Sequence, residues 1–359
     1  MPLTILSVAY PLTPVGPNTV GGSEQILTLM DAAIERAGHR SIVVAAEGST
    51  TVGKLQPTPR WDGDLNDEVR GWAQTQHRIA IRQALQENTV DLVHMHSLDW
   101  HEYLPAPGTP LLATLHLPPH WYPESVMRMQ RERTYLNCVS QSQRAVTSTA
   151  HLPVFVVENG VPVEHLATHV RKRDYVLALG RICPEKGFHL AIDAARRAEV
   201  SMILAGEVYR YETHVKYYEQ EIVPRLDQRR RFRGPVGFER KRRLLAGARC
   251  LLVPSLVPET SSLVAMESLA CGTPVIAYAN GALPEVVEHG KTGFIVHNER
   301  EMADAMQQAA ALDPEVCREA ARTRFSVDRM SHDYMALYRQ ILDAVPHVNA
   351  HSPAAQLSW

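Results

Sequence analysis

Two glutamates, Glu259 and Glu267, stand at a spacing that can hold a polar ligand between them. The apolar run 251–254 predicts a short buried strand, and a helix is expected over 261–271, ended by Gly272. Glu259 then lies in the loop before this helix, and Glu267 projects from it about two turns later. Free backbone N–H groups near 260–263 form an anion site at the helix start. A phosphate-binding site with a carboxylate on each side suits a nucleotide sugar, because this ligand carries hydroxyl groups on both sides of its phosphates.

This stretch resembles the donor-site motif of the retaining family 4 (group 1) glycosyltransferases, in which two glutamates are separated by seven residues. The resemblance continues into Gly272-Thr-Pro-Val-Ile-Ala, Gly281-Ala-Leu-Pro-Glu285 and Gly290-Lys-Thr-Gly293. It covers nearly the whole chain and is most specific from Gly180 to Val296. The resemblance implies the α/β GT-B fold, in which two Rossmann-like parallel-sheet domains face a central cleft and a C-terminal helix crosses back to the first domain.

A second motif, Gly180-Arg181-Ile-Cys-Pro-Glu-Lys186-Gly187, follows the first expected strand of the second half. Gly180 permits a sharp turn, and Arg181 and Lys186 then place two cations where open α/β sheets bind ligands. In the family that the chain resembles, the matching cations neutralise the leaving nucleoside diphosphate in place of a metal ion. We therefore expect no metal, no cofactor and no Asp-x-Asp metal motif. The alternative is two solvated basic residues before a helix.

The resemblance also implies a role for each glutamate. Glu267 would accept hydrogen bonds from the ribose, and Glu259 would hold hydroxyl groups of the transferred sugar near its developing positive charge. Many relatives have Gly-Phe-Gly-like residues after the first glutamate, whereas this chain has Thr260-Ser261-Ser262 and then Leu263. The backbone N–H groups can still serve there, but the side chains change the pocket, so the identity of the donor sugar does not follow from the motif.

In the first half, Gly21 and Gly22 open the first long expected helix and allow a ligand to approach the backbone closely. Turn chemistry alone is the alternative for this pair. His116 ends an expected strand at the level of the cleft, where a histidine of the family contacts the donor sugar near the reacting carbon. The expected catalytic residues are His116, Arg181, Lys186 and Glu259. The expected donor-binding residues are Gly21, Gly22, Gly180, Arg181, Lys186, Glu259, Thr260, Ser261, Ser262, Leu263 and Glu267.

Several histidines surround His116 in the sequence and raise a different hypothesis, a zinc site. His94 and His96 would share one face of a strand, as metal ligands can, with His101 and His120 nearby. The family resemblance explains this segment without a metal, and measured zinc content would decide between the two interpretations.

The chain of 359 residues is long enough for about two domains, and its 45% hydrophobic and 21% charged residues are typical of a globular protein. The formal net charge of −2 argues against a globally basic nucleic-acid-binding protein. The five cysteines show no metal-ligand spacing, which predicts buried, reduced thiols in a cytoplasmic protein. The N-terminus is interpreted as a first strand rather than a signal peptide, and no apolar run is long enough to cross a membrane.

The stretch from Arg225 to Arg243 is densely basic. The simplest interpretation is the solvated face of helices flanking a short strand at about 231–233. The alternative is peripheral contact with an anionic membrane, since many acceptors in the family are linked to lipids. Undetectable binding to anionic vesicles at low salt would exclude that alternative.

Alternating strands and helices predict parallel sheets in both halves. We expect an N-terminal acceptor-binding domain over 1–165, a donor domain over 166–326, a crossover helix over 327–345 and a tail over 346–359, with the polar segment 163–174 as a linker. The expected strands are 4–8, 41–46, 91–95, 111–115, 137–140 and 154–158, then 175–179, 202–205, 250–253, 275–278 and 294–296. The expected longer helices are 23–37, 68–86, 188–198, 239–246 and 299–312, the last capped by Asn298 and Glu301.

The sequence thus predicts a metal-independent retaining glycosyltransferase that moves a hexose-type sugar from a nucleoside diphosphate, UDP first and GDP second, to a hydroxyl acceptor. The acceptor is expected in polysaccharide, glycolipid or metabolite synthesis. The alternatives are a nucleotide-sugar epimerase or a glycogen-phosphorylase-like enzyme of the same fold, and a non-catalytic sugar-nucleotide-binding relative. Product analysis and phosphate dependence separate the enzymes.

Overall fold

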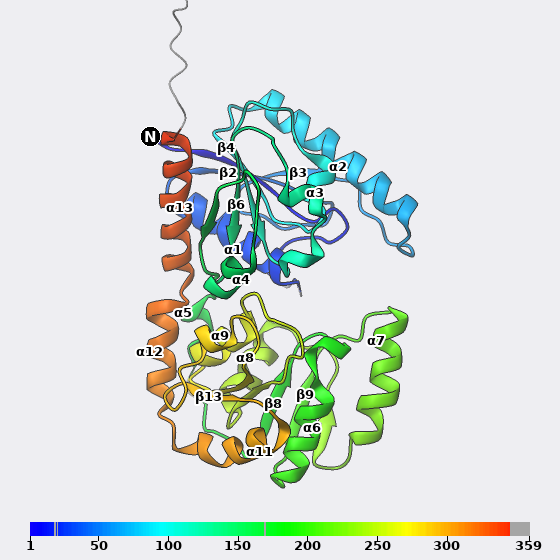
Figure 1. Ribbon diagram of the computed structural model, residues 1–359, viewed down its shortest axis with the longest axis vertical. Coiled ribbons are helices and arrows are strands. Elements are labelled where there is room, and N and C mark those ends of the chain that lie inside the picture. The colour runs from blue at the N-terminus through cyan, green and yellow to red at the C-terminus, as the bar shows by residue number, and fades with distance from the viewer. Residues whose placement is uncertain (18, 20, 169, 345–359) are drawn as a thin grey trace, which may run out of the picture.

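The computed structural model describes residues 1–17, 19, 21–168 and 170–344 of the chain. These residues form two lobes stacked along the longest axis of the molecule (Figure 1). Each lobe is built around one parallel β-sheet, as the alternation of strands and helices predicted. The predicted tail over 346–359 lies outside the described residues.

The first lobe holds a seven-stranded sheet in the order β3-β2-β1-β4-β5-β6-β7. Its central strands are buried on both faces because helices cover each side, which is why the run Ile42–Ala46 of β2 is apolar and fully buried rather than alternating. The strands are β1 (Thr4–Val8), β2 (Arg40–Ala46), β3 (Lys54–Thr58), β4 (Leu92–Met95), β5 (Leu111–Leu115), β6 (Thr134–Cys138) and β7 (Val154–Val156). The helices are α1 (Gly22–Arg36), α2 (Asp67–Glu87), η1 (Trp100–Tyr103), η2 (Pro119–Trp121), α3 (Glu124–Met127) and α4 (Gln141–Val146).

The second lobe holds a six-stranded sheet in the order β10-β9-β8-β11-β12-β13. Its strands are β8 (Val176–Leu179), β9 (Met202–Ala205), β10 (Arg230–Phe232), β11 (Leu251–Val253), β12 (Val275–Tyr278) and β13 (Gly293–Val296). Its longer helices are α6 (Phe188–Arg197), α8 (Phe238–Gly247), α9 (Leu263–Ala270) and α11 (Glu299–Gln308). Shorter helical segments are α5 (Val163–Leu166), η3 (Pro184–Lys186), α7 (Glu212–Tyr217), η4 (Tyr218–Ile222), η5 (Val223–Arg225), α10 (Leu283–Val286) and η6 (Ala309–Ala311).

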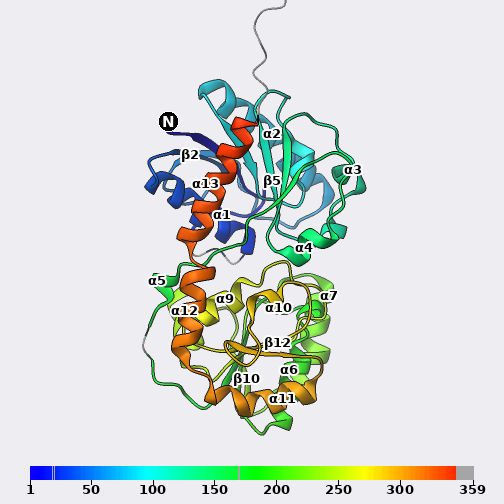
Figure 2. The ribbon, with the colours of Figure 1, turned by 60° about the vertical axis from the view of Figure 1, so that its left-hand side comes forward.

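Two helices close the described chain and run along both lobes (Figure 2). Helix α12 (Pro314–Arg324) packs on α9 of the second lobe, and α13 (Val327–Asp343) packs on α1 of the first. Met330, Tyr334, Leu337 and Ile341 recur at spacings of four, three and four along α13, and all are buried in the core that α13 shares with α1. The predicted GT-B architecture, including the helix that crosses back to the first lobe, is therefore confirmed.

Three differences between the sequence prediction and the structure have local causes. Strand β3 was not predicted because its sequence, Lys-Leu-Gln-Pro-Thr, is polar and contains Pro57, which an edge strand tolerates. The predicted linker 163–174 begins with α5, because Val163 and Leu166 are buried in the core of the second lobe. The helix expected from 261 begins two residues later, at Leu263, because the backbone of Ser262 is left-handed rather than helical.

The predicted cap of α11 is confirmed, since Asn298 Oδ1 accepts from the Glu301 backbone N–H at 2.9 Å.

No described helix combines the length and the apolar character that a membrane crossing requires.

Candidate active site

Lys186 and Glu259 form an ion pair in the second lobe, with Lys186 Nζ 2.6 Å from Glu259 Oε1. Gly187 makes this approach possible. It has a left-handed backbone (φ 61°), and a Cβ at this position would lie 2.3 Å from the carbonyl oxygen of Pro254. The loop after β8 can therefore lie directly on the loop after β11, and the backbone N–H of Leu256 donates to the Glu185 carbonyl at 2.8 Å.

The Glu259 carboxylate also accepts a hydrogen bond from the Ser255 hydroxyl. Burial acts to raise the pKa of this carboxyl, but the charge and the hydrogen bond of Lys186 outweigh burial, with Ser255 and Arg181 adding to the effect. The pKa of Glu259 therefore lies below its usual value, and the side chain is an anion at neutral pH. Its position is fixed from the other side by Gly281, whose left-handed backbone (φ 62°) brings it against the Glu259 backbone.

The second glutamate, Glu267, is buried in α9 with only 5% of its surface exposed. Its Oε1 accepts from Lys241 Nζ of α8 at 2.5 Å. Sequence reasoning missed Lys241 because this lysine belongs to the basic stretch from Arg225 to Arg243, which was interpreted as solvated. Each glutamate is thus paired with a lysine, Glu259 four residues before the first residue of α9 and Glu267 four residues after it.

Three residues lead into α9, and each has a different environment. Thr260 donates from Oγ1 to the carbonyl oxygen of His116 in the first lobe at 2.9 Å. Ser261 is buried, and its hydroxyl has no hydrogen-bond partner among the described residues. Ser262 has a left-handed backbone (φ 64°), which turns the chain into the helix. Leu263 follows as the first helical residue.

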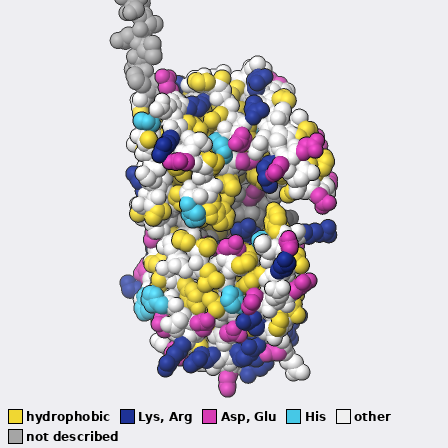
Figure 3. Space-filling model, turned by 45° about the vertical axis from the view of Figure 1, so that its right-hand side comes forward, with side chains coloured by type: hydrophobic (Ala, Val, Ile, Leu, Met, Phe, Trp, Pro, Cys, Tyr) yellow, Lys and Arg dark blue, Asp and Glu magenta, His cyan; other side chains and the backbone are white. Residues whose placement is uncertain are grey.

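The first lobe approaches this region at three points. Besides the Thr260–His116 bond, a Cβ on Gly22 would lie 3.5 Å from Leu263 Cδ1, so the loop at Gly21 and Gly22 faces the start of α9. The carboxylate of Glu285 accepts from the backbone N–H groups of Gln141 and Ser142 at 2.9 and 2.6 Å. Figure 3 shows the surface hollowed between the two lobes.

His116 lies at the end of β5 beside a chain of buried polar side chains. Its Nε2 is 3.1 Å from His96 Nδ1, and the two rings are stacked. Burial lowers the pKa of His116 to about 4, so its ring is neutral at pH 7. His94, next to His96 on β4, contacts Tyr338 of α13 and Thr114 at 2.7 Å each.

These contacts bear on the zinc hypothesis for the histidines. Both ring nitrogens of His94 have protein partners, at Tyr338 and Thr114. Among the described residues, the only group of three or more His, Cys, Asp and Glu side chains whose ligand atoms lie within 4.8 Å of one another is Cys183, Glu185 and His214. Hydrogen bonds thus account for His94, whereas His96 Nε2 and His101 Nδ1 are buried without a hydrogen-bond partner among the described residues.

One expectation about metal motifs is wrong. An Asp-x-Asp sequence does occur, at Asp62-Gly63-Asp64. Both carboxylates lie in an exposed loop before α2, and Arg60 pairs with Asp62 at 2.6 Å. The expectation about the cysteines is confirmed in that all five thiols are free and buried.

Two further predicted residues lie at the end of β8. Gly180 has φ 157° and is packed between Phe188 and Gly206, where a Cβ on Gly206 would clash with the Gly180 carbonyl. Arg181 is exposed and lies near enough to Glu259 to lower the pKa of its carboxyl. Arg181 is therefore directed at the same region as Lys186.

Four of the nine basic residues between Arg225 and Arg243, namely Arg225, Arg230, Lys241 and Arg242, are paired with acidic side chains of the second lobe. Arg225 contacts Asp193 and Glu221 at 2.9 Å each. Arg230 pairs with Asp227, and Arg242 with Glu239. These pairs favour the interpretation of a structural, partly solvated face.

Each lobe matches a known protein family. The family described as "Glycosyltransferase Family 4" matches residues 20–165, and "Glycosyl transferases group 1" matches residues 173–311. Together the two matches cover most of the chain and divide it at the junction between the lobes.

Curated relatives match over parts of the chain. An alpha-maltose-1-phosphate synthase of Mycolicibacterium smegmatis is 29% identical over 193 residues, which are 47% of this chain and 48% of that protein. A D-inositol 3-phosphate glycosyltransferase of Actinosynnema mirum is 38% identical over 122 residues, or 32% of this chain and 28% of that protein. The chain thus aligns with about half the length, or less, of these relatives.

Solved structures match over nearly the whole length. Sucrose-phosphate synthase from Thermosynechococcus elongatus superposes with a TM-score of 0.76 at 19% identity, covering 96% of this chain and 100% of that one. HepE of Anabaena, in complex with UDP-glucose, gives a TM-score of 0.72 at 20% identity, covering 94% and 100%. These likenesses establish the fold. With both family matches and the motif from Glu259 to Glu267 in place, the chain belongs to the family 4 (group 1) glycosyltransferases and has their GT-B fold.

Proposed function

We propose that this protein transfers a hexose-type sugar from a nucleoside diphosphate sugar to a hydroxyl group of an acceptor, without a metal ion and with retention of configuration. The observation that carries the proposal is the pair of lysine–glutamate contacts, Lys186–Glu259 and Lys241–Glu267, on either side of the start of α9. UDP is the first expectation for the nucleotide, because HepE of the same fold binds UDP-glucose, and GDP is the second.

The diphosphate would lie at the start of α9, where free N–H groups and the helix dipole favour an anion. Arg181 and Lys186 would meet the charge that develops on its β-phosphate as the sugar leaves, which is the task that a metal ion performs in other transferases. Lys186 is already held by Glu259, so little reorganisation of this cation is needed when the donor binds.

Each carboxylate keeps an oxygen that its lysine does not bind. Lys241 contacts Oε1 of Glu267, and Lys186 contacts Oε1 of Glu259. We assign the remaining oxygen of Glu267 to the ribose hydroxyls and that of Glu259 to hydroxyls of the transferred sugar. In this scheme the lysines orient both carboxylates before the donor arrives.

The transfer itself would take place on one face of the sugar. The bond between the anomeric carbon and the β-phosphate oxygen breaks, the acceptor oxygen bonds to the anomeric carbon on the same face, and the acceptor proton passes to the leaving phosphate. His116, neutral at pH 7, would contact the sugar near the reacting carbon, with His96 holding its ring.

The test is a transfer assay with UDP-, GDP-, ADP- and dTDP-sugars and a panel of hydroxyl acceptors, in the presence of EDTA. Release of one nucleoside diphosphate together with a glycosidic product that keeps the donor's anomeric configuration supports the proposal. An inverted product contradicts retention. An epimer of the free nucleotide sugar, or transfer only to inorganic phosphate, contradicts the proposal and favours another enzyme of the same fold.

A further inference from the structure

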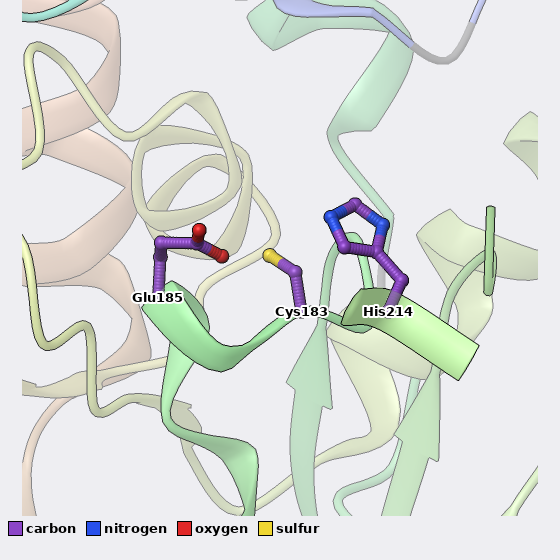
Figure 4. Close-up of side chains that lie close together, drawn as sticks. All are labelled: Cys183, Glu185 and His214. Carbon is purple, nitrogen blue, oxygen red and sulfur yellow. The ribbon is translucent and has the colours of Figure 1, made fainter. Parts of the chain in front are cut away.

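A second cluster of chemically active side chains lies next to the proposed donor site and has no part in it. Cys183, Glu185 and His214 each offer one ligand atom, and the three atoms lie within 4.8 Å of one another. Figure 4 shows the thiol between the carboxylate and the imidazole, with one ring nitrogen facing the sulfur. Cys183 and Glu185 flank Pro184 at η3, and His214 comes from α7, so two separate segments build the cluster.

We propose that this cluster binds one transition-metal ion of the Zn²⁺ class through the thiolate, the carboxylate and the imidazole. Sulfur and nitrogen ligands select Zn²⁺ or a similar ion, whereas Mg²⁺ and Ca²⁺ prefer oxygen ligands alone. Tetrahedral Zn²⁺ with bonds of about 2.0–2.3 Å places its ligand atoms roughly 3.3–3.8 Å apart. Side-chain shifts of about 1 Å therefore complete the site, and the fourth position is left for water.

The charges of the cluster suit its surroundings. Arg181 lies near His214 and Lys186 follows Glu185 directly, so an uncompensated cation would be repelled here. The thiolate and the carboxylate together carry two negative charges, which cancel those of Zn²⁺. The occupied site is neutral, and binding adds no net repulsion toward the two cations of the donor loop.

The histidine is not explained by contacts within the fold. His214 has only 9% of its surface exposed, and its Nδ1 is buried without a hydrogen-bond partner among the described residues. Buried histidine nitrogens are normally paired, and His77 and His96 share this departure with His214, but of these three only His214 has thiol and carboxylate ligand atoms within 4.8 Å. The ring is instead held at its sides by Tyr211 and Tyr209, with ring centroids 5.2 and 6.4 Å away, which fixes its orientation toward Cys183.

An ion bound at this cluster would restrain the donor loop, which carries Arg181 and Lys186. Cys183 lies two residues after Arg181, and Glu185 lies one residue before Lys186. A bound ion would tie this loop to α7 and restrain both phosphate-binding cations. This consequence, unlike the metal site itself, depends on the proposed function.

The test is metal binding to the full chain, first freed of metal with a chelator and then titrated with Zn²⁺ and, separately, with Co²⁺. We expect one ion per chain, a near-ultraviolet thiolate-to-cobalt charge-transfer band and a rise in melting temperature on Zn²⁺ addition. Cys183→Ala should abolish the charge-transfer band, and Cys183→Ala and His214→Ala should each weaken Zn²⁺ binding at least about 10-fold.

Cys317→Ala is the matched control, since Cys317 is equally buried but lies outside the cluster, and its variant should bind Zn²⁺ as the wild type does. Folded wild type that binds neither ion, or a charge-transfer band that persists in Cys183→Ala, overturns the proposal. Nucleotide binding is measured separately in EDTA. If the wild type binds nucleotide but no metal, the metal site alone is rejected. If it binds metal but no nucleotide, the proposed function alone is rejected.

Discussion

Replacing Lys186 by alanine removes the cation that pairs with Glu259 and tests the donor site most informatively. The Lys186 and Glu259 side chains are 26% and 11% exposed, so the pair lies between a surface ion pair and a buried one. A surface pair contributes about 0–1 kcal/mol, whereas breaking a buried pair costs about 3–5 kcal/mol because an unpaired charge remains. We expect Lys186→Ala to lower the free energy of unfolding by about 2–3 kcal/mol.

The same substitution should reduce turnover by at least ~100-fold, which corresponds to about 2.7 kcal/mol of lost transition-state stabilisation. The loss follows because the leaving diphosphate would then lack one of its two charge-assisted contacts. Urea unfolding measures the first effect, and the release of nucleoside diphosphate in a transfer assay measures the second.

A double-mutant cycle with Glu259→Gln separates the two effects. The neutral amide in Lys186→Ala/Glu259→Gln leaves no buried carboxylate unpaired, so part of the stability should return while turnover stays low. Lys54→Ala is the control, because Lys54 pairs with Glu87 at 3.4 Å and both side chains are over 40% exposed. A folded Lys186→Ala variant with near-normal turnover would refute the assignment of this site.

Three further predictions concern the Lys241–Glu267 pair, His96, and His77, which is buried in α2 of the first lobe. Glu267→Ala should cut turnover at least ~100-fold. Lys241→Ala should weaken donor binding, because Lys241 orients the Glu267 carboxylate. Titration of both variants with donor in the transfer assay measures turnover and donor affinity, and unchanged affinity in Lys241→Ala would show that the contact is only structural. His96→Ala should lower kcat more than it changes donor KM, since it frees the ring of His116, and equal effects on the two constants would count against a positioning role. Burial lowers the pKa of His77 to about 4. The unfolded chain then binds more protons at His77 between about pH 6.5 and 4, so the contribution of His77 to stability should fall by about 3 kcal/mol as the pH drops through this window, in addition to the losses from the buried His94, His96 and His116. Urea unfolding of wild type and His77→Gln across this window should show a smaller pH dependence of the free energy of unfolding in the variant, and an identical pH dependence would contradict this assignment.

The sequence predicts well those features that depend on neighbours along the chain. The strand before Glu259, the helix carrying Glu267 and the cap at Asn298 follow from apolar runs, glycines and capping residues within a few positions. The central strands of both sheets were placed to within a few residues because they are uninterrupted apolar segments.

Contacts between segments that are far apart in the sequence could not be predicted from neighbouring residues. Lys241 and Glu267 are 26 positions apart, and nothing in the basic stretch distinguishes Lys241 from its neighbours. His94 meets Tyr338 across 244 positions, and only the path of α13 over the first lobe brings them together. The cluster of Cys183, Glu185 and His214 was missed for the same reason, since α7 approaches the loop after β8 only in the folded chain.

The most direct test of the central claim is a thermal-shift comparison of UDP, GDP, ADP, dTDP and their sugar conjugates, with EDTA present, on wild type and Glu267→Ala. We expect selective stabilisation of the wild type by one diphosphate family and a much smaller shift in the variant. The absence of a shift with any nucleotide, or an equal shift in Glu267→Ala, would contradict metal-free donor binding at the start of α9.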